Sequence, residues 1–118
     1  MPALAVGPTV QFLMFTGGGT PTVPRPAGIN HACWSVDGFK PDAVQKTLES
    51  YGLTPRDGVQ GPVGPLRHYV TMRMQDRGGA PGGTPELYFT DPEGILMQLQ
   101  DTSYCGGSGF LGNDCPKT

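Results

Sequence analysis

The sequence predicts a small α+β domain in which one strand, one helix and three further strands follow each other along the chain. Two observations carry this prediction. One segment with helical periodicity lies among short apolar segments that have the alternation or the β-branched composition of strands. In addition, 19 Gly and 13 Pro among 118 residues divide the chain into short elements joined by turns.

The first third of the chain is expected to hold two strands separated by a linker. Residues 9–16 (TVQFLMFT) are apolar, aromatic and β-branched, which is typical of a buried strand. Residues 17–28 are rich in Gly and Pro without periodicity and are interpreted as a linker. Residues 29–36 (INHACWSV) alternate, so that His31 and Cys33 share one face of a strand.

Residues 42–53 (DAVQKTLESYGL) are the predicted helix. Pro41 suits the first helical position, and Gly52 is a natural C-cap. The helix should pack its apolar stripe against Trp34 and Val36 of the preceding strand. The stripe residues recur at i, i+4 and i+7, as Val44, Leu48 and Tyr51.

Three further strands complete the unit. They are expected at residues 68–75, 86–90 and 95–100. The last two are joined by Asp91-Pro92-Glu93-Gly94, whose residue types are those of a tight turn. Residues 29–101 therefore form one complete βαβββ unit, and residues 102–118 form a Gly-rich tail on the domain surface.

A short internal similarity relates the first residues to this unit. Gly7 precedes an apolar segment with Gln11 four positions later, and Gly94 stands in the same relation to Gln98. A polar side chain within a buried strand needs a hydrogen-bond partner or a wet cavity. We therefore interpret residues 1–16 as the trailing strand of a preceding, similar unit within a single domain.

Charge and hydropathy exclude two classes of partner. The net charge is −2 and the eight Lys and Arg are scattered, so no basic stripe is present to bind nucleic acid. No apolar run approaches the ~20 residues of a membrane-spanning helix. The N-terminal residues lack the basic segment of a signal peptide. We expect a soluble protein, cytoplasmic or, with a signal upstream of this chain, exported.

Cys105 and Cys115 flank a Gly-rich loop that is flexible enough to close. Two interpretations remain open: a disulfide in an oxidising compartment, or two reduced thiols in the tail. Cys33 lies in an apolar strand and is expected to be a small buried side chain.

The βαβββ unit, Ile29-Asn30-His31 and the closing residues 88–100 (YFTDPEGILMQLQ) together resemble the vicinal oxygen chelate superfamily of glyoxalases, extradiol dioxygenases and bleomycin-resistance proteins. The resemblance covers residues 29–101 and is most specific at residues 89–94. It implies a curved mixed sheet in which two units pair around a cleft, often with a divalent metal at its floor. The metal ligands implied are a His on the first strand and a Glu on the last. They correspond to His31 and, as a departure, Gln98.

A second departure concerns the first unit, of which residues 1–16 supply only the end. The resemblance therefore implies a fragment or a shortened form that completes its cleft by pairing with another copy. A homodimer is the expected assembly, because half a cleft with an open strand edge is a liability.

Five residues are candidates for the site. His31 is either a ligand of Zn, Ni, Mn or Fe or a hydrogen-bonded strand histidine. Gln98 is either a weak ligand or an amide that binds substrate or water. Gln11 and Gln100 are expected to face the same cleft, and Arg73 either meets an anionic substrate or forms an ion pair. Glu86, beside the Gly-rich turn, is expected to be solvated.

Three functions of the protein remain open, the first two of which involve a small-molecule ligand. The first is a metal-dependent lyase or dioxygenase, in which the ion would polarise a substrate oxygen. Its weak point is the missing carboxylate at Gln98. The second is metal-free binding, favoured by this change and by the apolar Leu13 and Leu96. The third is a shortened paralogue without activity. The sequence assigns no catalytic residue.

Overall fold

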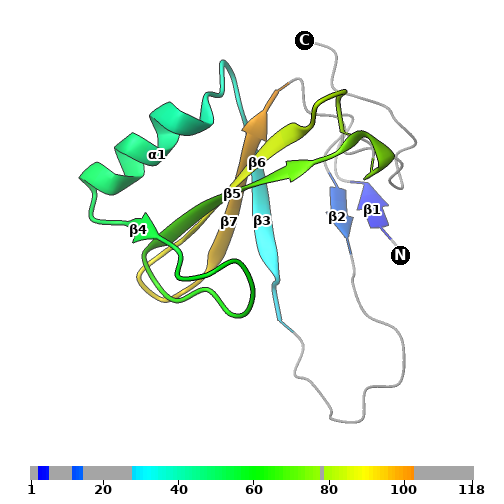
Figure 1. Ribbon diagram of the computed structural model, residues 1–118. Coiled ribbons are helices and arrows are strands. Elements are labelled where there is room, and N and C mark those ends of the chain that lie inside the picture. Colours follow the sequence, from blue (N-terminus) through cyan, green and yellow to red (C-terminus); the bar gives the residue numbers. More distant parts are fainter. Residues whose placement is uncertain (1–2, 6–11, 15–27, 78, 103–118) are drawn as a thin grey trace.

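The computed structural model describes residues 3–5, 12–14, 28–77 and 79–102 (Figure 1). In this part of the chain one α-helix accompanies a two-stranded sheet and a five-stranded mixed sheet, which confirms the predicted α+β class. The elements are β1 (Ala3–Ala5), β2 (Phe12–Met14), β3 (His31–Val36), α1 (Pro41–Ser50), β4 (Thr54–Pro55), β5 (Arg67–Arg73), a 3-10 turn (Gln75–Arg77), β6 (Thr84–Thr90) and β7 (Leu96–Asp101).

The larger sheet has the strand order β3-β7-β6-β5-β4. Strand β7 runs parallel to β3 and antiparallel to β6, which in turn runs antiparallel to β5 (Figure 1). The first and last strands of residues 28–102 therefore lie side by side, with His31 opposite Leu96 and Cys33 opposite Gln98. This pairing places residues that are 65 positions apart on one face of the sheet.

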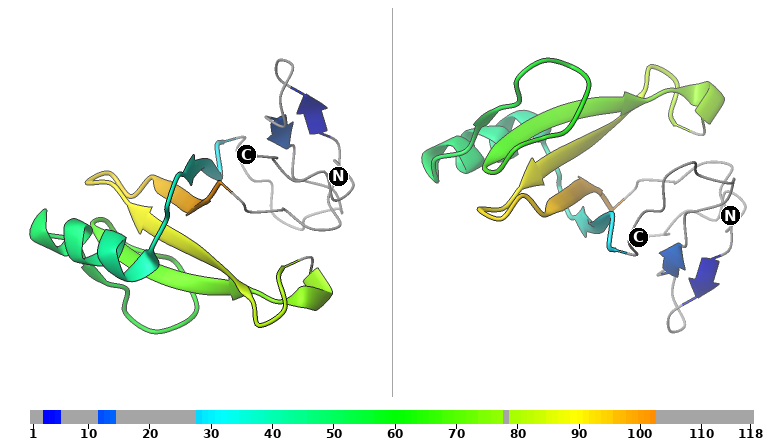
Figure 2. Two further views of the ribbon diagram at one scale, coloured as in Figure 1. Left: turned by 90° about the horizontal axis from the view of Figure 1, so that it is seen from above. Right: turned by 90° about the horizontal axis from the view of Figure 1, so that it is seen from below.

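The two faces of this sheet differ in chemistry. Helix α1 lies along one of them, where it contacts β5 and β6 (Figure 2). On this helix face Leu87 has no exposed surface and forms the centre of a small apolar core. The opposite face, here called the polar face, carries alternate residues of the four long strands: His31, Cys33, Tyr69, Arg73, Glu86, Tyr88, Gln98 and Gln100.

Helix α1 begins at the predicted position and ends at Ser50, so that residues 51–53 of the predicted helix lie beyond its end. Pro41 stands at its first position. Gly52 has φ of +96°, and its N–H donates to the Glu49 carbonyl at 3.0 Å. The expected packing against Trp34 is wrong, because Trp34 keeps 58% of its surface exposed. Strand β3 is at the edge of the sheet, whereas α1 lies over β5 and β6.

Two short strands were not predicted, and each has a local reason. Strand β1 pairs antiparallel with β2, and its three residues are too short to show alternation. Strand β4 has only two residues, one of them Pro55.

In the described part of the chain no helix combines the length and apolar character that a membrane crossing requires.

Candidate functional site

Gln98 lies at the centre of the polar face. It occupies the middle of β7, opposite Cys33 on β3 and Tyr88 on β6. Only 5% of its surface is exposed. A carboxamide buried in this way must find partners for both its oxygen and its nitrogen.

Both ends of the Gln98 carboxamide are satisfied by neighbouring side chains. Its Nε2 donates to Glu86 Oε2 at 3.0 Å and to Gln100 Oε1 at 2.8 Å. Its Oε1 accepts from the Cys33 thiol at 3.3 Å and lies 3.1 Å from His31 Nε2. The structure thus brings together three of the residues singled out from the sequence: His31, Gln98 and Gln100.

Glu86 is the buried acceptor in which this network ends. Its Oε1 accepts from Arg73 Nε at 2.9 Å, and its Oε2 accepts from the Tyr88 hydroxyl at 3.1 Å as well as from Gln98. Glu86 is 4% exposed, so the expectation of a solvated carboxylate is wrong. The signal that could have found it is the alternation of β6, in which Glu86 and Tyr88 share a face opposite Leu87.

Aromatic rings extend the polar face beyond this network. Tyr69 and Tyr88 stack at 5.0 Å between ring centroids, and His31 meets the Tyr88 ring edge to face at 5.8 Å. The Arg56 guanidinium lies 4.6 Å above the Tyr69 ring. Its Nε is the one buried side-chain nitrogen or oxygen among the described residues that has no hydrogen-bond partner. The ring of Tyr69 is therefore its compensating contact.

The thiol and the phenols of the polar face stay neutral near physiological pH. Cys33 is exposed as a residue, so the expectation of a buried side chain is wrong. Partial desolvation of its thiol, followed by the negative charge of Glu86, still raises the pKa of Cys33 to about 11, while Arg73 acts in the opposite direction. Burial and then the Glu86 carboxylate also raise the pKa of Tyr88. Burial raises the pKa of Tyr69, against the effect of Arg56. Charge near Gln98 is thus concentrated in the Arg73–Glu86 pair.

The described residues do not fit a divalent-metal site by themselves. Within the described ranges, no three His, Cys, Asp or Glu side chains come close enough together to hold an ion. The Cys33 thiol is protonated, and the Glu86 carboxylate is bound to Arg73. What remains is one imidazole nitrogen of His31 and one amide oxygen of Gln98, whereas such sites assemble three or four ionic or imidazole donors.

The other sequence candidates are divided between the polar face, the helix face and the part of the chain that is not described. Gln11, Cys105 and Cys115 are outside the described residues, so their predicted roles stay predictions. Arg73 lies on the polar face in its ion pair. His68 lies on the helix face with 2% of its surface exposed, where it contacts Glu49 at 3.1 Å.

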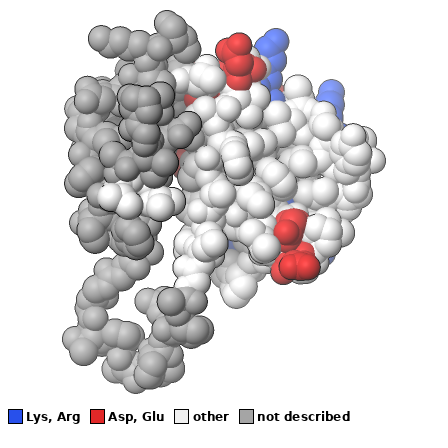
Figure 3. Space-filling model, turned by 180° about the vertical axis from the view of Figure 1, so that it is seen from behind, with Lys and Arg blue, Asp and Glu red and all other residues white. Residues whose placement is uncertain are grey.

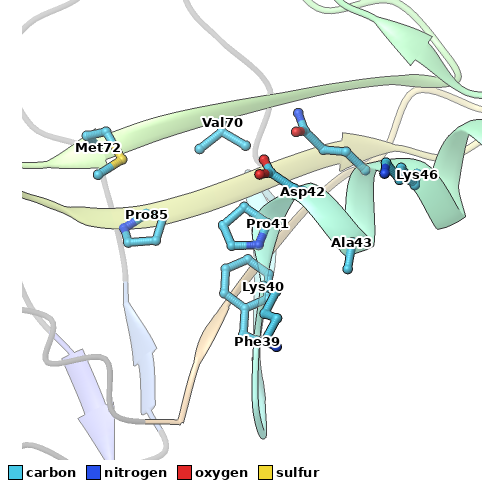
Figure 4. Close-up of a pocket in the computed structure, with 10 residues that line it drawn as sticks. Phe39, Lys40, Pro41, Asp42, Ala43, Lys46, Val70, Met72 and Pro85 are labelled. Atoms are coloured by element: carbon cyan, nitrogen blue, oxygen red, sulfur yellow. The ribbon is translucent and has the colours of Figure 1, made fainter.

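A cavity of about 790 Å³ opens on the other side of the sheet, between α1 and strands β5 and β6 (Figure 4). Its lining includes Phe39, Pro41, Val70, Met72 and Pro85. It holds none of the residues of the hydrogen-bond network around Gln98. Seen from behind, the described surface is mainly uncharged, with isolated acidic and basic side chains (Figure 3).

Comparison with known proteins adds no further identification. No protein-family model, no curated protein and no solved structure matches this chain. The likeness to the vicinal oxygen chelate superfamily therefore rests on the residues of the sequence itself.

Proposed function

We propose that the polar face is the floor of a small-molecule binding cleft, in a protein of the glyoxalase and bleomycin-resistance type that binds without metal. The observation that carries this proposal is the fully bonded Gln98 carboxamide between His31 and Glu86. Buried polar networks of this kind hold their groups in fixed positions, which favours recognition of a polar ligand.

The element order supports the family part of the proposal. Residues 29–101 run strand, helix and then the three long strands β5, β6 and β7. The pairing of β3 with β7 brings His31 and Gln98 to one place, as the resemblance implies for the two ligand positions. The sequence motif at residues 89–94 lies at the β6–β7 turn, directly before Gln98.

The polar face offers donors and aromatic surface to a ligand. Gln100 Nε2 has no hydrogen-bond partner in the described part of the chain, while Gln100 Oε1 already accepts from Gln98. An ether, carbonyl or hydroxyl oxygen would accept from this amide. The stacked rings of Tyr69 and Tyr88 provide a flat apolar wall beside it. A small, oxygen-bearing and uncharged molecule fits these groups best.

A second copy of the chain would complete the cleft. Strand β3 ends the sheet on one side, and its six residues include no charged side chain and no Pro. The other edge is β4, which is only two residues long and contains Pro55. An unprotected strand edge invites pairing with another strand. We propose an antiparallel β3–β3 pair, which would join the two polar faces into one surface.

A metal-dependent lyase or dioxygenase is the second candidate. It is favoured by the 3.1 Å separation of His31 Nε2 and Gln98 Oε1, because two donors to one ion can lie at about this distance. Against it stands the incomplete donor set described above.

Thermal unfolding tests the binding proposal with three small, uncharged probes that carry hydroxyl or carbonyl oxygens: catechol, phenol and dihydroxyacetone. A probe that binds the native state raises its melting temperature. We expect at least one probe to stabilise the wild type and the Gln60→Met variant but not Gln98→Met. Gln60 lies in an exposed loop, so this variant controls for the same change of side chain. No stabilisation, or equal stabilisation of all three proteins, would contradict the proposal.

Metal content separates the two candidates. The protein is loaded with Zn, Ni, Mn or Fe(II), desalted and analysed by mass spectrometry beside His31→Ala. Metal-free binding predicts substoichiometric metal in both proteins. Stoichiometric metal in the wild type that is lost in His31→Ala would establish the metal-dependent candidate.

Light scattering during size-exclusion chromatography tests the proposed dimer. We expect twice the 12.5 kDa chain mass for the wild type and the chain mass for Trp34→Lys, which places a charge on the β3 edge. Val59→Lys is the matched control, because Val59 is 88% exposed in a loop. A monomeric wild type would disprove the dimer.

A further inference from the structure

The cavity between α1 and strands β5 and β6 lies on the helix face, on the opposite side of the sheet from the Gln98 network. We propose that this cavity binds a small organic carboxylate with an apolar body, and that Lys40 and Lys46 hold the anionic end of the ligand. The inference goes beyond the proposed function and does not depend on it, because the lining of the cavity includes no residue of the polar face.

The size and the wall of the cavity suit the apolar body of such a ligand. Its volume of about 790 Å³ lies in the range of about 300–1,000 Å³ that is typical of small-molecule sites. Met72 in this wall keeps 46% of its surface exposed, and a flexible thioether adapts to the shape of an apolar ligand. The apolar part of the wall consists of Phe39, Pro41, Ala43, Val70, Met72 and Pro85.

The charged residues of the cavity belong to its helix side. Lys40 directly precedes α1, and Asp42 and Lys46 lie within it, whereas Met72 and Pro85 lie at the end away from the helix (Figure 4). An amphipathic ligand could therefore rest its apolar body on the strands and turn its charged end toward α1.

Both lysines of the cavity lack a carboxylate partner among the described residues. The two ion pairs found there are His68–Glu49 and Arg73–Glu86. Lys46 follows Asp42 by one helical turn without forming an ion pair with it. Two unpaired ammonium groups beside an apolar wall are complementary in charge to a carboxylate.

The other two polar residues of the wall are already stabilised by the protein. Asp42 lies in the first turn of α1, where the helix dipole favours a negative charge. Gln45 Nε2 lies 3.3 Å from His68 Nδ1. Nε2 of His68 faces the Glu49 carboxylate, which can only accept, so Nδ1 of the neutral imidazole accepts from the Gln45 amide. The two lysines are thus the polar groups that remain for an anion.

Lys40 is an unfavourable residue for the stability of α1. It is the N-cap of this helix and makes no side-chain hydrogen bond to the first turn. Ser, Thr, Asp and Asn are the preferred N-caps, and a positive charge is disfavoured at this end of the helix dipole. Lys40→Ser should therefore stabilise the helix and weaken ligand binding, two effects that a purely structural role of Lys40 would not combine.

NMR titration with octanoate and octylammonium, both below their micelle concentrations, tests the inference. The two probes have the same apolar chain and opposite charges. We expect octanoate to shift the methyl signals of Val70 and Met72 saturably while the signals of Gln98 stay in place. Octylammonium should bind about ten-fold more weakly, because it is repelled by two lysines that attract the carboxylate.

Three lysine variants measure the contribution of charge. Lys40→Ser and Lys46→Gln should each weaken octanoate binding about three-fold. Lys117→Gln makes the same change of charge outside the described residues and should bind octanoate like the wild type. Thermal unfolding of Lys40→Ser should show a raised melting temperature, so that its weaker binding does not reflect loss of fold.

Three results would overturn the inference. They are the absence of saturable shifts at Val70 and Met72, equal or tighter binding of octylammonium, and undiminished octanoate binding in the double variant Lys40→Ser with Lys46→Gln. Because the octanoate titration of the wild type reports on the helix face, its failure is distinguishable from failure of the binding function proposed for the polar face.

Discussion

Arg73 and Glu86 form a largely buried ion pair across two neighbouring strands of the sheet. Arg73 Nε donates to Glu86 Oε1 at 2.9 Å, and the side chains are 24% and 5% exposed. The two residues are diagonal neighbours, because Glu86 is paired with Thr71 and Arg73 with Thr84. Together with Tyr88 and Gln98, this arginine gives the Glu86 carboxylate three donors.

Glu86→Gln should destabilise the protein by about 2 kcal/mol, because it leaves the Arg73 charge facing a neutral amide. The loss is smaller than for a fully buried pair, since Arg73 keeps part of its surface in water. Urea unfolding measures the difference. Glu93→Gln makes the same change at an exposed turn residue and should alter stability by less than about 0.5 kcal/mol. Equal stabilities of the two variants would show that the ion pair contributes little.

The Cys33 thiol should titrate at about pH 11, well above its ordinary value of 9.0. Its contribution to stability is therefore complete below pH 9 and is lost as the pH rises from 9 toward 11. Thiolate absorbance measures this in a Cys105→Ser, Cys115→Ser background. Adding Glu86→Gln should lower the pKa of Cys33 while leaving it above 9, because partial desolvation of the thiol is the larger cause. A midpoint near 9 in both proteins would show that water solvates the thiol of this exposed residue fully.

The local elements of the fold were predictable because their signals lie within a few residues. The Asp91–Gly94 turn has the predicted form: Gly94 has φ of +85°, and Asp91 Oδ1 accepts from the backbone N–H groups of Glu93 and Ile95. The packing of α1 was predicted wrongly, because it depends on the strand order. A sequence does not display the fact that β7 lies between β3 and β6.

In the candidate site, too, local signals predict some features and the strand arrangement determines others. His31, Gln98 and Gln100 could be placed on one face from alternation and the family resemblance. The alternation of β6 could also have placed Glu86 on one face with Tyr88. Its burial could not be predicted, because it depends on the register of β6 with β7, which pairs Tyr88 with Gln98. That register brings Glu86 within reach of a nitrogen 12 residues away along the chain.

Glu49→Ala should lower stability by about 1 to 2 kcal/mol, although the Glu49 side chain is 50% exposed. The cost arises at His68, whose Nε2 donates to Glu49 Oε1 at 3.1 Å and which is 2% exposed. Removing the acceptor leaves a buried N–H without a partner. Lys46→Ala truncates an exposed side chain on the same helix and serves as the control. A Glu49→Ala loss no larger than that of the control would mean that water reaches His68.

Gly94→Ala should destabilise the protein by about 1 kcal/mol through backbone strain alone. Gly94 has φ of +85°, and a Cβ at this position would meet no atom within 4 Å, so steric overlap adds nothing. Gly28→Ala is the matched control, because its Cβ would also enter open space and its φ lies outside the left-handed region. Chemical denaturation of both variants isolates the contribution of φ.

The turn also bears on the site, because the Gly94 N–H donates to the Asp91 carbonyl at 2.9 Å and closes the β6–β7 connection. That connection sets the register that places Gln98 opposite Tyr88. We expect the β6–β7 register to stay unchanged in Gly94→Ala, so that the NMR signals of His31 and Gln98 remain near their wild-type positions. Large shifts of these signals without loss of fold would instead show that the turn controls the alignment of the site.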